Sequence, residues 1–150
     1  MWPLRDRFRS IEMRFYRSGP GHHHDVAIMQ IKEPPAPVAT EEPSRWRPSA
    51  RRVGINHIAI GYPDRESFMG QLEHLQANGV TFHMRGNHGV THSAYINDPD
   101  GNGIEVLYEL PAEVWEGDLK KALGYYKQLP TEGPEALADD ADYARFPASA

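Results

Sequence analysis

The chain has 150 residues, a formal net charge of −5 and no cysteine. This length suits one domain with a buried core, and the lack of cysteine excludes disulfides, thiolate metal ligands and a cysteine nucleophile. An acidic balance without a long basic block argues against DNA or RNA as a partner. No apolar run approaches the roughly 20 residues of a membrane span. The first ten residues lack the apolar stretch of a signal peptide, so we expect a cytoplasmic protein.

The first part of the chain carries the pattern of a β-hairpin. Residues 11–17 alternate between apolar and polar side chains, as a half-buried strand does. The turn sequence SGPG follows, and three histidines then lead into a second predicted strand that ends at residue 31. We therefore expect a hairpin within residues 1–32. Residues 33–50 contain five prolines and are predicted to form an extended linker.

Residues 51–111 predict a complete βαβββ unit. The apolar run at 51–61 is the first predicted strand. Asp64 is a suitable N-cap for a following helix, which Asn78 and Gly79 would close. Further strands are predicted at residues 80–85, 92–97 and 104–108. The turn sequence DPDGNG joins the last two strands, and the predicted fold class is α+β with a mixed sheet.

Two residues with metal-binding side chains stand within predicted strands of this unit. His57 lies in its first strand and Glu105 in its last. Strand alternation places Glu105 on the opposite face from Ile104 and Val106, so its carboxylate needs either solvent or a partner. A lone strand histidine is commonly structural, and a lone glutamate can be an edge-strand charge. Together, one histidine and one glutamate on two strands of one sheet indicate a metal site.

Residues 112–150 are predicted to form an acidic, helix-prone tail. One apolar stripe would contain Trp115, Leu119, Ala122, Leu123 and Tyr126. From residue 130 onward we expect poor order.

The remaining histidines near these elements have plainer interpretations. His22 and His23 are expected to face solvent. His88 and His92 lie in or beside a polar loop, and one of the two is expected to be only solvated.

The second half of the chain resembles a known superfamily. GINHIAIG at 54–61, followed by a helix and then by HGVTHSAYINDPDGNGIEVLYE at 88–109, resembles the second module of the vicinal oxygen chelate superfamily. This superfamily includes glyoxalases, bleomycin resistance proteins and extradiol dioxygenases, and the match is most like the catechol 2,3-dioxygenase type. The resemblance implies two βαβββ modules that form a cup around one divalent metal, Fe(II) or alternatively Mn(II). It also implies a small aromatic diol and O2 as reactants.

The same resemblance implies roles for five residues. His57 and Glu105 match two of the metal ligands of the family. HHHDVAIM at 22–29 resembles the strand entry that carries the acid–base histidine, which corresponds to His24. Tyr95 matches a tyrosine that donates a hydrogen bond to the bound substrate. His88 matches a histidine near the metal that orients dioxygen or substrate.

One departure from the family pattern concerns the third metal ligand. In the family it lies on the first strand of the first module, further upstream of His24 than the 23 residues that precede it here. The first module is therefore expected to lack its opening strand and helix, and the site to lack one ligand. We expect such a chain to be impaired alone and to pair through its exposed sheet edge into a homodimer.

Two alternatives remain within the superfamily. The first is a glyoxalase-like metalloenzyme, which would carry a ligand on the closing strand of module one. The corresponding position is Ala27, which argues against this alternative. The second is a non-enzymatic cup that binds a small molecule without turning it over.

Overall fold

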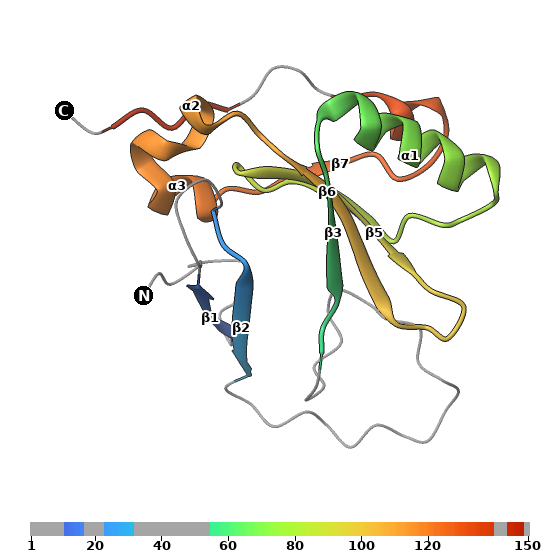
Figure 1. The fold of residues 1–150 in the computed structure, drawn as a ribbon, viewed down its shortest axis with the longest axis horizontal. Helices are drawn as coiled ribbons and strands as arrows, with labels where there is room; N and C mark the ends of the chain where they lie inside the picture. The colour runs from blue at the N-terminus through green and yellow to red at the C-terminus, as the bar shows by residue number, and fades with distance from the viewer. Residues whose placement is uncertain (1–10, 17–22, 32–54, 140–143, 149–150) are drawn as a thin grey trace.

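The computed structural model describes residues 11–16, 23–31, 55–139 and 144–148. These residues form a two-stranded hairpin and a five-stranded mixed sheet with few helices, an α+β arrangement (Figure 1). The hairpin consists of β1 (Ile11–Tyr16) and β2 (Val26–Ile31), paired antiparallel as predicted. The predicted turn at 18–21 and the predicted linker at 33–50 lie outside the described residues.

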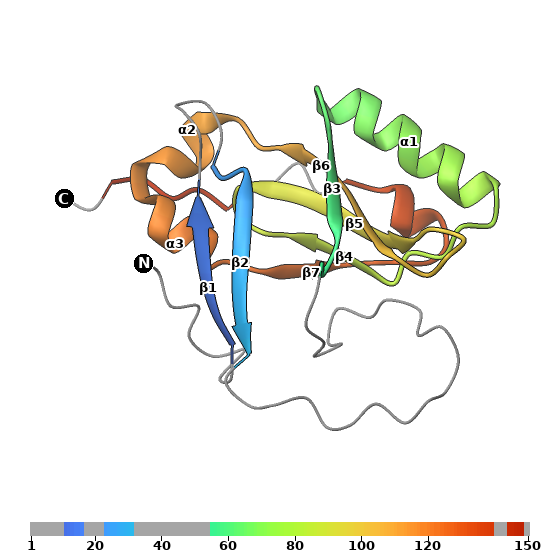
Figure 2. The ribbon, with the colours of Figure 1, turned by 60° about the horizontal axis from the view of Figure 1, so that its bottom comes forward.

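The five-stranded sheet has the order β3-β6-β5-β4-β7 (Figure 2). Its strands are β3 (Ile58–Tyr62), β4 (Met84–Asn87), β5 (Thr91–Asn97), β6 (Gly103–Glu109) and β7 (Lys127–Leu129). β3 runs parallel to β6, and the other neighbours are antiparallel. With the helix between β3 and β4, the first four strands in chain order confirm the predicted βαβββ unit. β7 was not predicted, and it joins the tail to the same sheet.

The helix α1 (Arg65–Ala77) begins and ends as the sequence predicts. The Asp64 side chain accepts a hydrogen bond from the Ser67 backbone N–H at 2.8 Å, which caps the first turn. At the other end, the N–H groups of Gly79 and Val80 donate to the carbonyls of Gln76 and Leu75, and Gly79 has a φ of 73°. This is the Schellman arrangement. It also corrects the predicted strand at 80–85, because the Val80 N–H is used by the helix cap and β4 begins only at Met84.

The two faces of the sheet differ in what they contact. The outer face, defined here by Ala94, Val106 and Tyr108, packs against α1, and the rings of Tyr108 and Phe68 lie 5.1 Å apart. The inner face is defined by Ser93, Tyr95 and Glu105, since residues alternate along β5 and β6 and Tyr95 is paired in register with Glu105. The predicted separation of Glu105 from its apolar neighbours is therefore confirmed.

The tail differs from the single helix that the apolar stripe predicts. It contains α2 (Ala112–Trp115), the 3-10 helix η1 (Glu116–Asp118), α3 (Leu119–Leu123), β7 and the 3-10 helix η2 (Pro134–Leu137). The helix breaks at Gly117 because residues 144–148 cross there. A Cβ on Gly117 would lie 2.7 Å from the carbonyl oxygen of Phe146, and the Phe146 N–H donates to Val114. The tail from residue 130, for which we expected poor order, is described at 130–139 and 144–148 and contains η2.

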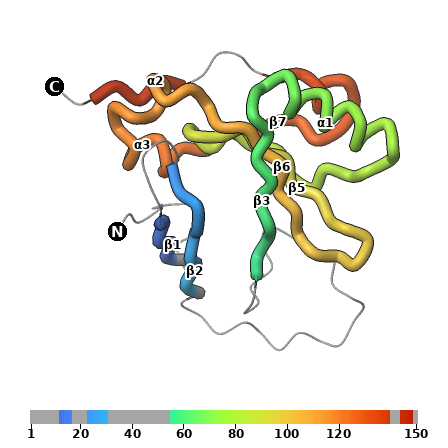
Figure 3. Tube along the Cα trace, viewed as in Figure 1, coloured from blue at the N-terminus to red at the C-terminus, as the bar shows by residue number. Residues whose placement is uncertain are grey.

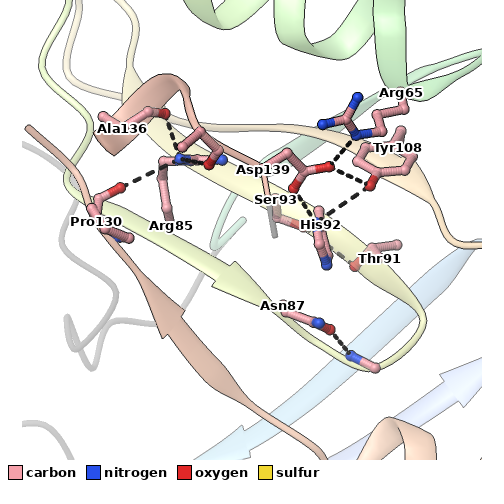
Figure 4. Close-up of polar contacts among 12 residues, drawn as sticks. Arg65, Arg85, Asn87, Thr91, His92, Ser93, Tyr108, Pro130, Ala136 and Asp139 are labelled. Atoms are coloured by element: carbon pink, nitrogen blue, oxygen red, sulfur yellow. Dashed lines mark hydrogen bonds and ion pairs between the residues drawn. The ribbon is translucent and has the colours of Figure 1, made fainter. Parts of the chain in front are cut away.

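The tail segment that contains η2 lies beside α1 (Figure 3). A buried polar network holds the residues after η2 against the outer face (Figure 4). Asp139 accepts hydrogen bonds from His92 Nδ1 at 2.6 Å, from the Tyr108 hydroxyl at 2.9 Å and from Arg65 Nε at 2.7 Å. Burial raises the pKa of Asp139, but the bonds from His92, Tyr108 and Arg65 outweigh it, so the pKa lies below its usual value. Next to this network, the buried Arg85 guanidinium donates to the Ala136 carbonyl.

The hairpin lies on the side of the sheet away from α1 (Figure 1). His23, just before β2, is buried, with its Nδ1 3.3 Å from the Glu109 carboxylate and its ring 6.4 Å from Trp115. The expectation that His23 faces solvent is therefore wrong, because the end of β6 provides it with a carboxylate. His22 lies outside the described residues. Within the described ranges, no helix is long and apolar enough to cross a membrane.

Candidate metal centre

His57 and Glu105 meet on the inner face of the sheet. Their closest atoms, His57 Nε2 and Glu105 Oε2, are 3.0 Å apart. The parallel register of β3 and β6 pairs Ala59 with Glu105, and His57, two residues before Ala59, points to the same face. His57 itself precedes β3 instead of lying within the strand as predicted. The predicted closeness of the two side chains is confirmed.

The other polar atom of the His57 and Glu105 side chains also has a hydrogen-bond partner. His57 Nδ1 lies 2.8 Å from the side-chain oxygen of Asn56. An amide oxygen can only accept, so Nδ1 carries the proton. Nε2 therefore donates to Glu105 Oε2 when the ring is doubly protonated, and it presents a lone pair to a cation only when that second proton is lost. On the other side, Glu105 Oε1 accepts a 2.7 Å hydrogen bond from the Tyr95 hydroxyl. Such partners orient metal ligands in proteins.

His88 extends this chain of hydrogen bonds. Its Nε2 lies 3.1 Å from the Tyr95 hydroxyl oxygen. The single hydroxyl proton of Tyr95 makes the hydrogen bond to Glu105, so the hydroxyl oxygen accepts a hydrogen bond from the His88 Nε2–H. Burial lowers the pKa of His88 and raises the pKa of Tyr95 well above its usual value. Both groups are therefore neutral at neutral pH and form an ordered donor chain toward the carboxylate.

Glu105 is ionised despite being only 7% exposed. Burial raises its pKa, but the hydrogen bond and charge of His57 lower it. In the acidic range where Glu105 titrates, the protonated His88 and the Tyr95 hydroxyl lower it further, so the pKa is about 2. A carboxylate that stays charged in a mostly buried position is a suitable anionic ligand for a divalent cation.

His24 approaches the same site from the hairpin. Its half-buried ring packs against the rings of Phe15 at 4.7 Å and His23 at 4.2 Å. Burial lowers the pKa of His24, while the charge of Glu105 raises it and that of His57 lowers it further. The Nδ1 atom of His24 is buried, and no described residue forms a hydrogen bond with it.

The expectation that His88 or His92 is merely solvated is wrong for both. His88 is half-buried against Tyr95 and Tyr126. His92 is fully buried on the outer face with Asp139. Alternation along β5 explains the separation, because His92 and Tyr95 are an odd number of residues apart and so point to opposite faces.

Comparison with known proteins agrees with this geometry. Residues 3–106 match the family model described as Glyoxalase/Bleomycin resistance protein/Dioxygenase superfamily. The chain belongs to this superfamily.

Curated relatives within the superfamily are dioxygenases by name. The chain is 37% identical over 71 residues to a catechol-2,3-dioxygenase of Bacillus subtilis (strain 168), covering 47% of this chain and 25% of that protein. It is 33% identical over 84 residues to biphenyl-2,3-diol 1,2-dioxygenase 2 of Rhodococcus globerulus, covering 56% of this chain and 39% of the relative. A second Rhodococcus globerulus enzyme, biphenyl-2,3-diol 1,2-dioxygenase 3, is 31% identical over 84 residues, covering 56% and 40%. The chain thus spans between a quarter and two fifths of these relatives.

The superfamily implies a divalent metal, and two residues of the inner site, His57 and Glu105, are suitable ligands for it. An imidazole nitrogen and a carboxylate oxygen are donors that suit non-haem iron or manganese. Two ligands about 2.1 Å from an ion and at a right angle lie about 3 Å apart, which matches the separation of His57 Nε2 and Glu105 Oε2. Across the described part of the chain, no group of three or more potential ligands forms, so the described site supplies two.

Sequence reasoning missed two residues of this site. Asn56 holds the His57 ring, and its position next to a predicted ligand was the available signal. Tyr126, which the stripe pattern assigned to a helix, instead lies against His88 with ring centroids 5.2 Å apart. Its location depends on β7, which no local pattern predicted.

Proposed function

We propose that this chain forms the metal-binding half of an extradiol ring-cleaving dioxygenase. The substrate would be a catechol-type diol, with O2 as the second reactant and Fe(II), or alternatively Mn(II), as the metal. The observation that carries the proposal is the His57–Glu105 pair with its supporting partners on one face of the sheet. The names of the curated relatives support the same chemistry.

A bound metal would hold the diol and O2 next to each other and supply electron density to the ring. His24 would accept a proton from a diol hydroxyl, since burial favours its neutral imidazole and no described residue forms a hydrogen bond with its Nδ1. Tyr95 would keep Glu105 oriented through the single hydrogen bond that its hydroxyl donates to the carboxylate. The hydrogen bond to substrate that the family resemblance implies would require this proton to leave Glu105. His88 would hold the Tyr95 hydroxyl in place.

The third ligand of a two-histidine, one-carboxylate site is not among the described residues around this pair. We propose that the chain pairs with a second copy of itself through an exposed sheet edge. β3 lies at one end of the sheet order, and its Ile58 and Ile60 side chains are 55% and 47% exposed. β2 likewise exposes Val26 and Ile28. An exposed edge and apolar side chains favour pairing with another strand.

The test is turnover of a panel of catechols by protein loaded with Fe(II) under anaerobic conditions and then given O2. We expect oxygen uptake with formation of a yellow ring-opened product, both dependent on Glu105. A Glu105→Gln variant with the same rate as the wild type would refute the proposal.

A second candidate function is a cup that binds a small molecule without turnover. It is favoured by the presence of only two potential ligands in the described part of the site. Metal content separates the two functions. Tight binding of a diol by chelator-treated protein, without oxygen uptake after iron is added, would favour the binding role.

A further inference from the structure

Two adjacent tyrosines after α3 point in opposite directions. The Tyr125 ring packs edge-on against Phe146 at 5.4 Å, within the hydrophobic core cluster. The Tyr126 ring instead packs against His88, with centroids 5.2 Å apart and planes inclined by 59°. The chain is becoming extended here, since β7 starts at Lys127. Extended backbone alternates its side chains, so the tail delivers Tyr126 to the inner face.

A glycine in β4, Gly86, leaves room for the Tyr126 ring. Gly86 pairs with Ser93 and therefore lies on the inner face. A Cβ built on Gly86 would lie 2.6 Å from Cε2 of Tyr126 and 3.3 Å from its Cζ. Real Cβ atoms do not approach a ring carbon so closely, so the ring rests on the bare backbone of β4. Any larger residue at position 86 would displace it.

His88 stands between this ring and the metal-binding pair. It contacts Tyr126 on one side, while its Nε2 lies 3.1 Å from the Tyr95 hydroxyl on the other. His88 comes from the short connection between β4 and β5, where Gly89 has a φ of 78°. Packing against a neighbouring ring fixes the rotamer of a side chain that the backbone alone leaves free.

We infer that Tyr126 is a positioning residue for the site on the inner face, and that its ring holds His88 in the orientation that serves Tyr95 and Glu105. This inference rests on the proposed function for its catalytic consequence, although the contact itself does not depend on turnover. The aromatic ring of Tyr126 positions His88, and the absence of a side chain at Gly86 leaves room for that ring.

The experiment compares Tyr126→Phe, Tyr126→Ala, Gly86→Ala and the double variant Gly86→Ala/Tyr126→Ala in the full chain. Gly61→Ala is the matched control, because a Cβ on that strand glycine meets only Leu107 Cδ1, at 3.9 Å. Nitrogen-15 spectra of the neutral histidines, without metal, report whether His88 keeps its proton on Nε2. Steady-state kinetics on catechol report kcat and KM separately.

We expect Gly61→Ala to behave like the wild type. Tyr126→Phe keeps the ring and should therefore keep the His88 tautomer. Tyr126→Ala and Gly86→Ala should each mix the two His88 tautomers and lower kcat roughly 10- to 100-fold, with KM little changed. The double variant should be no worse than Tyr126→Ala alone, because removing the ring also removes the clash. Thermal midpoints of all variants verify that they fold.

An unchanged His88 tautomer in a folded Tyr126→Ala protein would overturn the inference. Fully additive losses in the double variant would do the same, since they would mean that Gly86 and Tyr126 act separately. If no variant, including the wild type, turns over catechol, the proposed dioxygenase function fails, and the nitrogen spectra still decide whether Tyr126 positions His88.

Discussion

Two histidine–carboxylate pairs lie on opposite faces of the same sheet, and their surroundings differ. On the outer face, His92 and Asp139 are 2.6 Å apart and both side chains are fully buried. Both oxygens of Asp139 are engaged, by His92, Tyr108 and Arg65. On the inner face, His57 and Glu105 are 3.0 Å apart, and the exposed fractions of their side chains are 29% and 9%.

The difference lies in what surrounds each pair. Asp139 accepts from three donors and is closed off from solvent, so the outer pair can only hold the tail in place. Among the described residues, Asn56 and Tyr95 hold the outer polar atoms of the inner pair, and the His57 side chain is 29% exposed. A histidine beside a carboxylate therefore indicates a ligand site only when its outward atoms are oriented and still accessible.

Replacing the inner carboxylate gives the largest expected effect. Glu105→Gln removes an anionic ligand, so metal affinity should fall by more than the roughly 10- to 100-fold typical of losing a supporting partner. Metal content after dialysis at a fixed free iron concentration measures this. Asp139→Asn is the matched control on the outer face and should keep the metal content of the wild type. Stoichiometric iron in Glu105→Gln would contradict the assignment.

Replacing the outer carboxylate should instead reduce stability. Asp139→Asn leaves buried His92 and the half-exposed Arg65 without their anion, so the free energy of unfolding should fall by about 2 to 4 kcal/mol. Urea unfolding followed by circular dichroism measures the change. Glu132→Gln, an exposed carboxylate on the same segment, should have almost no effect. An equally small effect of Asp139→Asn would show that the outer network does not anchor the tail.

The inner pair should also make stability depend on pH in protein treated with a chelator. Glu105 has its pKa lowered from 4.5 to about 2. A lowered folded-state pKa contributes stability that is present above the unfolded value and is lost as pH falls toward the folded one. The free energy of unfolding should therefore decrease by about 2 to 3 kcal/mol between pH 4.5 and 2. The stability of Glu105→Gln should not show this decrease between pH 4.5 and 2. Identical pH profiles for the variant and the wild type would contradict the prediction.

The smallest expected effects come from two matched tyrosines. Tyr95→Phe removes the donor to Glu105, so metal affinity should fall by about 10-fold with little change in stability. Tyr108→Phe removes a donor to Asp139, so stability should fall by about 1 kcal/mol with metal affinity unchanged. Metal titration and urea unfolding of both variants test the contrast. If both tyrosines affect metal affinity equally, the two faces are not independent.

Local patterns in the sequence were sufficient for the central βαβββ unit. The Asp64 cap and the alternation through β6 depend on neighbours a few residues away, and the structure confirms them. The closeness of His57 and Glu105 followed from the same information. Once the first and last strands of the unit are placed side by side, alternation determines which side chains share a face.

Only the tertiary structure decided the roles of the tail and of the remaining histidines. Asp139 meets His92 across 47 positions of sequence, and Tyr126 meets His88 only because β7 pairs with β4. His23 is buried because Glu109 lies opposite it. Each of these contacts joins elements that are distant in the chain, whereas periodicity and capping report on adjacent residues. The sequence by itself determined the βαβββ order and the nearness of His57 and Glu105. Long-range packing decided which polar groups surround that pair and which ones anchor the fold.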